Sequence, residues 1–214
     1  MFRNYRKFER GEHIVVAVDS AAGGLDYVAA QFVSKTHIDV PLVYQSKQTM
    51  TAFTPKLAEM LEKIYDQTGI KPTVAVERAN GGSFEMDRLA TLNRSGKFEI
   101  FKMPRKGNVD VQTSIHLGWD TTSATRPTML QELKEAIDTK VLVLYDAPTI
   151  EELFSFIIAQ TSSSWKAQAE QGAHDDLVMS LAIGWQLYQL VPTRKLEQVF
   201  IPRPFQPADD VIGV

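Results

Sequence analysis

The sequence contains no cysteine among its 214 residues. Disulfide bonds and thiolate metal sites are therefore excluded, and the composition fits a reducing compartment. The chain also lacks a run of about 18 apolar residues, so no membrane span is expected. Its polar, basic N-terminal stretch, MFRNYRKFERGE, has no apolar segment of the kind found in secretory signals, so no signal peptide is expected.

Positive charge is not in excess either. The chain has 23 Lys and Arg against 26 Asp and Glu, a net charge of −3. A domain with strong bulk affinity for nucleic acid usually has a basic footprint, so such affinity is not expected. The net charge does not exclude DNA as a partner, because a site that holds metal ions needs acidic residues, and these lower the net charge. The length and a hydrophobic content of 44% fit one large globular domain.

The order of the expected elements favours an α/β fold with a mixed sheet. Three strands with short connections, which suggest an antiparallel meander, precede a helix that Thr54 would cap with Pro55 in its first turn. Residues 105–125 show no clear period and should form a long loop or hairpin. Strands are expected at 14–18, 25–34, 37–46, 73–77, 98–104 and 140–146, and helices at 55–68, 83–96, 126–138, 148–160 and 171–191.

These elements suggest three parts of the chain. Residues 1–12 would be a linker or N-terminal extension. Residues 13–192 would form the folded domain, with parallel strands added to the antiparallel start and helices flanking the sheet. Residues 193–214 would be a C-terminal tail, because the stretch that begins at Pro192, PTRKLEQVFIPRPFQPADDVIGV, contains several prolines.

Acidic residues stand where apolar elements begin or end. Asp19 ends the first strand, Glu77 ends the fourth, and Asp175 and Asp176 open the last helix. If the first and fourth strands are parallel neighbours, Asp19 and Glu77 emerge at the same edge of the sheet, where open α/β sheets place their sites. A helix that starts at this edge would bring Asp176 to them.

Three like charges cannot gather without compensation, and divalent cations would supply it. A site with only oxygen ligands suits Mg²⁺ or Mn²⁺, and two such ions about 4 Å apart can promote cleavage of a phosphodiester. Each acidic residue also has an ordinary structural role, because Asp caps helices and strand-end carboxylates are often solvated. His174 is more typical of local hydrogen bonding than of a ligand.

Basic residues near these positions could bind phosphates without reading sequence, although a solvated loop would look the same. The candidates are Arg78, Lys102, Arg105, Lys106 and Arg126. Trp119 and Trp165 are more typical of a core than of a binding surface.

Several stretches resemble the nuclease domain of tailed-bacteriophage terminase large subunits, the DNA-packaging motor. VVAVDSAAGG, VAVERANGG and GAHDDLVMSLAIG resemble its three acidic motifs, and GWDTTSATRPTMLQELKEAI and APTIEELFSFI resemble segments between them. The resemblance implies an RNase H-like fold and two-metal cleavage of double-stranded DNA. By position it implies Asp19, Glu77 and Asp176 as metal ligands, with Asp175 as an additional candidate.

The same resemblance implies partners and a location. They are double-stranded DNA and, in the full motor, an ATPase domain, a portal and a small terminase subunit, in the cytoplasm of a phage-infected bacterium. The phosphate loop G-x-x-x-x-G-K-[ST] of a packaging ATPase does not occur. An isolated nuclease domain that does not hydrolyse ATP by itself is therefore expected.

Other functions stay open. A junction resolvase or a transposase-like nuclease would use the same three carboxylates. VAVDSAAGG also resembles the phosphate-binding hairpin of actin-like ATPases and sugar kinases, but that fold needs a second similar domain and a second glycine-rich loop. A non-catalytic binding module is disfavoured by the intact set of Asp19, Glu77 and Asp176.

Overall fold

A six-stranded mixed sheet forms the centre of the protein. The computed structural model describes residues 1–20, 27–103, 116–160 and 174–196. The strand order is β1-β4-β3-β2-β5-β6. β1–β4, β4–β3 and β3–β2 are antiparallel pairs, whereas β5 and β6 are added in parallel, so the predicted mixed sheet is confirmed. The strands are β1 Phe2–Asn4, β2 Ile14–Asp19, β3 Val28–Ser34, β4 Asp39–Ser46, β5 Thr73–Val76 and β6 Glu99–Ile100.

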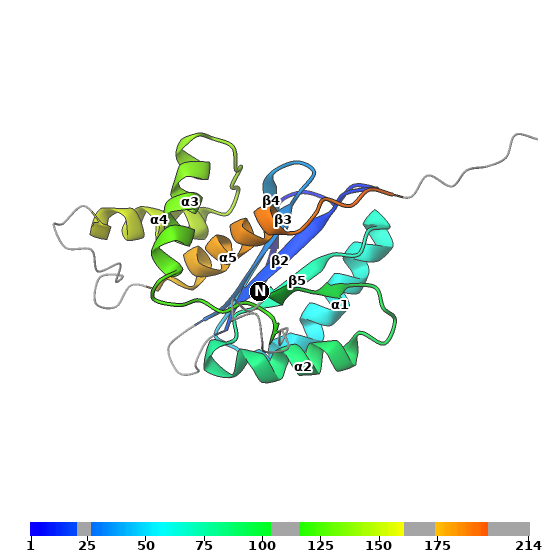
Figure 1. Cartoon of the computed structure of the whole chain (residues 1–214). Helices are drawn as coiled ribbons and strands as arrows, with labels where there is room; N and C mark the ends of the chain where they lie inside the picture. Colours follow the sequence, from blue (N-terminus) through cyan, green and yellow to red (C-terminus); the bar gives the residue numbers. More distant parts are fainter. Residues whose placement is uncertain (21–26, 104–115, 161–173, 197–214) are drawn as a thin grey trace, which may run out of the picture.

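Helices cover both faces of this sheet (Figure 1). α1 (Met50–Thr68) and α2 (Gly82–Leu92) lie on one face, and α3 (Arg126–Asp138), α4 (Ala147–Gln160) and α5 (Asp176–Leu190) lie on the other. β2 and β3 are buried along their whole lengths, which explains why most of their residues are apolar. Within the described ranges, no helix is long and apolar enough to cross a membrane.

The register between β2 and β5 places the predicted acidic residues side by side. The two strands are parallel, and Val18 is the partner of Val76. The chain continues from these residues into Asp19 and Glu77, so both side chains emerge at the same edge of the sheet. The condition under which Asp19 and Glu77 share one edge, that the first and fourth apolar strands are parallel neighbours, is therefore met.

The predicted start of α1 is wrong. The helix begins directly after Thr49, which caps it, and Pro55 lies inside the helix. Proline cannot donate to the carbonyl four residues earlier, which here belongs to Thr51. The guanidinium of Arg88 donates to that carbonyl instead, at 2.6 Å. Thr54 is buried and does not cap the helix.

Three other boundaries differ from the sequence prediction. Residues 140–146 form no strand, since only Val143 makes a bridge, with Asp39. Instead, β1 pairs with Leu42–Tyr44 at this edge of β4. α2 ends at Leu92, before Gly96. The predicted strand 98–104 is divided between β6 and a separate two-stranded sheet, β7 (Lys102–Met103) with β8 (His116–Leu117), whose connection lies outside the described residues.

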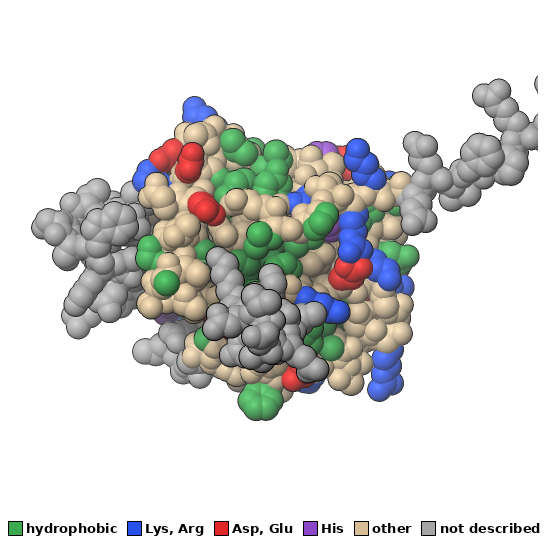
Figure 2. Space-filling view, viewed as in Figure 1, with side chains coloured by type: hydrophobic (Ala, Val, Ile, Leu, Met, Phe, Trp, Pro, Cys, Tyr) green, Lys and Arg blue, Asp and Glu red, His purple; other side chains and the backbone are tan. Residues whose placement is uncertain are grey.

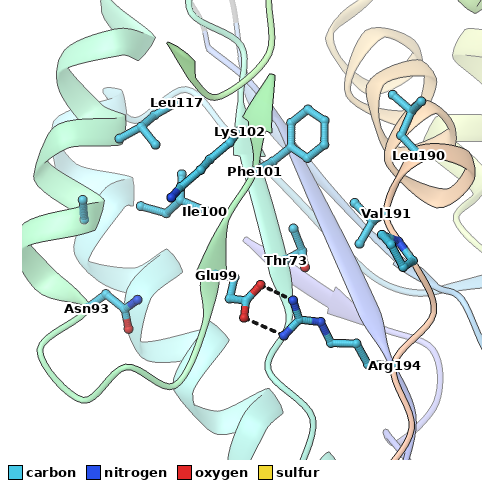
Figure 3. A pocket seen from close by; sticks show the side chains of 12 residues that line it. Thr73, Asn93, Glu99, Ile100, Phe101, Lys102, Leu117, Leu190, Val191 and Arg194 are labelled. Carbon is cyan, nitrogen blue, oxygen red and sulfur yellow. Dashed lines mark hydrogen bonds and ion pairs between the residues drawn. The ribbon is translucent and has the colours of Figure 1, made fainter. Parts of the chain in front are cut away.

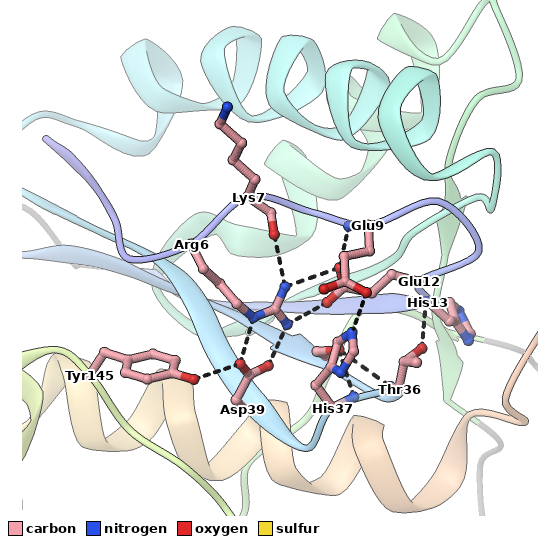
Figure 4. A network of polar contacts seen from close by, with 10 residues as sticks. Arg6, Lys7, Glu9, Glu12, His13, Thr36, His37, Asp39 and Tyr145 are labelled. Atoms are coloured by element: carbon pink, nitrogen blue, oxygen red, sulfur yellow. Dashed lines mark hydrogen bonds and ion pairs between the residues drawn. The ribbon is translucent and has the colours of Figure 1, made fainter.

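The N-terminal segment packs on the domain. β1 pairs with β4, and the Arg6 side chain lies between two acidic residues (Figure 4). Its guanidinium donates to Asp39 at 2.6 Å and to Glu12 at 2.5 Å, and the hydroxyl of Tyr145 donates to Asp39 at 3.0 Å. These contacts fix residues 2–12 to the edge of the sheet.

Candidate active site

The backbone holds Glu77 on both sides. The Glu77 amide donates to the Val18 carbonyl at 2.8 Å, and the next amide, that of Arg78, donates to the Trp119 carbonyl at 2.8 Å. Trp119 forms a parallel bridge with Glu77 and is buried, as expected of a core aromatic residue. Glu77 is therefore fixed like a residue in a central strand, although β5 ends one residue earlier.

The segment that follows Glu77 is tied to the segment that follows Asp19. The Ser20 hydroxyl contacts the carbonyl oxygens of Glu77 at 3.1 Å and Ala79 at 2.7 Å, and the Asn80 amide group donates to the Ser20 carbonyl at 3.3 Å. The two strand ends cannot separate without breaking these bonds. Sequence analysis missed Ser20, whose only signal was a small polar residue directly after an acidic strand end.

Gly82 allows α2 to start against Glu77. A Cβ atom at Gly82 would lie 1.8 Å from the Glu77 carbonyl oxygen, far inside any real contact distance. The preceding Gly81 has φ 87°, in the left-handed region that favours glycine. The glycine pair after the acidic residue is thus required by a turn and by a close backbone approach.

α5 brings a third carboxylate to this edge. The Asp176 side chain accepts a hydrogen bond from the Tyr27 amide at 3.3 Å and lies 3.7 Å from Nδ1 of His174. The helix approaches the sheet closely at Gly184, where a Cβ atom would be only 3.0 Å from Cγ2 of Val33. The absence of a side chain at Gly184 therefore lets the helix pack closely on the sheet.

The carboxylates form one electrostatic cluster. Asp19, Glu77 and Asp176 are 8%, 9% and 8% exposed. Burial raises the pKa of Asp19 well above its ordinary value, and a hydrogen bond with Glu77 and the charges of Asp176 and Asp175 raise that pKa further. Buried acidic groups with raised pKa values are typical of functional sites.

Asp175 has a different environment. Its side chain makes no capping hydrogen bond to α5 and instead forms an ion pair with Arg126, the first residue of α3.

The amide of Val178 in the first turn of α5 donates to Glu152 of α4 at 2.8 Å. Sequence analysis missed Glu152, because a cap from another helix leaves no local signal.

The donor types fit a divalent cation, since all are carboxylate oxygens. In the part of the chain that the structure describes, however, no three Asp, Glu or His side chains are arranged so that they could hold one ion. Asp19 contacts Glu77, and Asp175 contacts Arg126. A cation bound by three of these residues would therefore replace some of these contacts and reorient side chains.

The predicted DNA-binding residues are dispersed. Arg78 lies beside the site, where its Nε is 3.0 Å from a carboxylate oxygen of Asp120. Arg105 and Lys106 lie outside the described residues. On the face shown in Figure 2, most of the Lys and Arg side chains lie on the right of the view.

Lys102 faces a pocket away from the carboxylates. The pocket has a volume of about 640 Å³ and includes Thr73, which begins β5, and Lys102 (Figure 3). Asp19, Glu77 and Asp176 do not line it. An ion pair between Glu99 and Arg194 closes one side of this pocket, with one N–O distance of 2.5 Å.

Solved structures with the same fold are viral terminase nucleases. The large terminase nuclease from thermophilic phage G20c has 16% identity and a TM-score of 0.58, over 87% of this chain and 86% of that chain. The Thermus phage P74-26 large terminase nuclease domain has 15% identity and a TM-score of 0.57, over 91% and 87%. The human cytomegalovirus terminase nuclease domain, soaked with Mn, has 16% identity and a TM-score of 0.53, over 83% of each chain.

These similarities establish the fold. The chain has the RNase H-like fold of these nuclease domains, as the resemblance implied. The G20c nuclease has also been solved with bound cobalt, zinc and magnesium. No protein-family model matches the chain.

Proposed function

We propose that this chain is a metal-dependent endonuclease that cleaves double-stranded DNA during phage genome packaging. The observation that carries the proposal is the parallel register of β2 and β5, which puts Asp19 beside Glu77, together with Asp176 on α5. The fold shared with terminase nuclease domains supports it, because their structures contain divalent metals in several cases.

In this proposal, Asp19, Glu77 and Asp176 hold two ions, Mg²⁺ or Mn²⁺, with Asp175 as an additional ligand candidate. Two such cations would activate a water molecule and stabilise the charge that develops on the leaving oxygen of the phosphodiester. The protein holds the ligands rigidly: the sheet fixes Asp19 and Glu77, and Ser20 ties their strand ends together.

The DNA contacts in this proposal are with phosphates. Arg78 stands next to Glu77, and Lys102, Arg105 and Lys106 remain lower-ranking candidates. Such contacts position a duplex without reading its bases, so the ends produced by cleavage should show little sequence preference. An ATPase domain, a portal and a small terminase subunit would be the partners of this domain in the infected host cell.

The test is cleavage of supercoiled and linear DNA by the purified chain with Mn²⁺ or Mg²⁺. We expect cleavage that EDTA abolishes and that Asp19→Asn removes, with both proteins folded. Asp87→Asn is the matched control, because Asp87 is an exposed acidic residue on α2. Absence of cleavage by the wild-type protein with either cation would overturn the proposal.

The same assay separates the alternatives within this fold. A four-way junction is added as a third substrate. Strong preference for the junction over linear duplex would identify a junction resolvase that uses the same carboxylates.

A further inference from the structure

α5 is capped by a residue from another helix. The first amides of any helix lack partners within that helix, and the residue before the helix usually supplies one. Here Asp175 occupies that position but pairs with Arg126. Oε1 of Glu152 on α4 accepts a hydrogen bond from the Val178 amide at 2.8 Å, and Leu177 is a second backbone partner.

The contact between α4 and α5 is also anchored to the sheet. The side-chain amide of Gln31 on β3 donates to the Thr149 hydroxyl of α4 at 3.0 Å and lies 3.3 Å from the Leu177 carbonyl of α5. Gln31 and Thr149 are almost completely buried. Thr149 precedes Glu152 by three residues, so both lie on the same face of α4. One face of this helix therefore fixes the first turn of α5.

We propose that Glu152 is a positioning residue that orients the first turn of α5 and thereby holds Asp176 near Asp19. The proposal rests on the proposed function in taking Asp176 as a cation ligand. Asp176 immediately precedes the two residues whose amides contact Glu152, so a rotation of this turn would move its side chain. With this acceptor supplied by α4, Asp175 makes no side-chain capping bond to α5 and pairs with Arg126.

The chemistry of Glu152 predicts which substitution preserves this role. Burial raises the pKa of Glu152 to about 8, and the charges of Asp176 and Asp175 contribute in the same direction. The bond from the Val178 amide, at 2.8 Å, needs only a side-chain oxygen that accepts, so an uncharged acceptor should serve as well as a carboxylate. Glu152→Gln keeps such an acceptor, whereas Glu152→Ala removes it. Glu151→Ala is the matched control, because Glu151 is the exposed neighbour on the same helix.

The cap is tested first without metal, by hydrogen exchange of the Leu177 and Val178 amides. We expect faster exchange in Glu152→Ala and wild-type protection in Glu152→Gln and Glu151→Ala. Unchanged exchange in Glu152→Ala would overturn the proposal. If Glu152→Ala does not fold, Glu152→Asp replaces it, because its shorter side chain withdraws the acceptor by one methylene.

The positioning role is tested by Mn²⁺ affinity, measured by electron paramagnetic resonance, and by the Mn²⁺ dependence of cleavage. Loss of a residue that orients a metal ligand typically weakens metal affinity by about 10–100-fold. We expect a loss of this size in Glu152→Ala and near-wild-type affinity in Glu152→Gln, with thermal melts to confirm folding. If Glu152 had a purely structural role, Glu152→Gln would not restore the Mn²⁺ affinity that Glu152→Ala loses.

Each contrary result has a distinct meaning. Wild-type protein that neither binds Mn²⁺ nor cuts DNA overturns the proposed function. Wild-type binding with unchanged affinity in Glu152→Ala overturns the positioning role alone. Failure of Glu152→Gln to the same extent as Asp176→Asn, with intact capping, would show that the Glu152 charge itself binds the cation, and this too overturns the positioning role.

Discussion

Arg126 at the start of α3 forms an ion pair with Asp175 at the start of α5. This pair distinguishes two adjacent acidic residues that look equivalent in the sequence. Asp175 is turned toward a basic partner and remains partly exposed, whereas Asp176 is buried near Asp19 and Glu77. The structure thereby assigns different environments to the two residues.

Asp176→Asn should therefore abolish cleavage, whereas Asp175→Asn should only reduce it. Successive helical residues point about 100° apart, so both side chains cannot face the site equally. Parallel assays at several Mn²⁺ concentrations measure the difference. Arg126→Ala is the companion variant and should alter stability by no more than about 1 kcal/mol, as for a partly exposed pair. Equal losses in the two Asp variants would mean that both residues coordinate the cation.

Asp19→Asn should make the metal-free protein more stable while removing its activity. Because the pKa of Asp19 is raised, its ionised form destabilises the folded state, so a neutral Asn should increase the free energy of unfolding by about 1 kcal/mol where Asp19 is ionised, and the gain should grow as the pH rises. Urea unfolding in EDTA measures it, with Asp87→Asn as the exposed control. A variant that is less stable than wild type without metal would contradict the idea that the carboxylates repel one another.

Gly82→Ala should impair cleavage more than Gly81→Ala. The added Cβ at Gly82 would collide with the Glu77 carbonyl and push the acidic residue or α2 aside. At Gly81 there is open space, and only the positive φ is unfavourable, at a cost of about 1 kcal/mol. Cleavage rates and thermal melts of both variants separate displacement of Glu77 from general strain. Similar activity in the two variants would show that the close approach has no role.

The sequence predicted what depends on local pattern. β2 and β5 are apolar runs that end in acidic residues, and the order of elements predicted a mixed sheet with parallel additions, although the pairing of these two strands was only a condition of the argument. The C-terminus of α1 was also predictable, because Gly69 takes the left-handed conformation that ends the helix.

What the sequence did not predict depends on partners that are distant along the chain. Pro55 is tolerated within α1 because Arg88 supplies a missing hydrogen bond from α2. The cap on α5 depends on how α4 packs against it. β1 has only three residues and no detectable period, and its position is fixed by pairing with β4 and by the contacts of Arg6.

His13 should make the protein acid-sensitive. Its side chain is buried, and burial lowers the pKa of His13 to about 4, with the charges of Arg194 and Lys35 acting in the same direction. The folded state therefore binds a proton less readily than the unfolded state, whose His titrates near 6.5. The stabilisation is complete above that pH and is lost as the pH falls toward 4, by about 3 kcal/mol in total.

Urea unfolding of wild type and His13→Asn between pH 8 and pH 4 measures this contribution. The Asn side chain offers an oxygen where Nδ1 of His13 accepts from the Arg194 amide at 3.1 Å. We expect the stability difference between wild type and variant to shrink as the pH falls. A difference that is constant over this range would show that His13 does not titrate differently on folding.

Arg6→Ala should destabilise the domain strongly, although Arg6 lies within residues 1–12, for which the sequence suggested a linker or N-terminal extension. The substitution leaves the carboxylates of Glu12 and Asp39 buried without their main cationic partner, a loss of about 3 kcal/mol in the free energy of unfolding. Lys7→Ala is the control, because Lys7 is exposed and contacts Arg6 only through its backbone carbonyl.

Burial alone would raise the pKa of Glu12, but hydrogen bonds from Arg6 and the Glu9 amide lower it below its ordinary value. The contribution of Arg6 should therefore be present at neutral pH and decline in acid, as Glu12 becomes protonated. Unfolding curves at pH 7 and below pH 4 measure this, and equal stability of the two variants at pH 7 would show that the N-terminal segment is dispensable for folding.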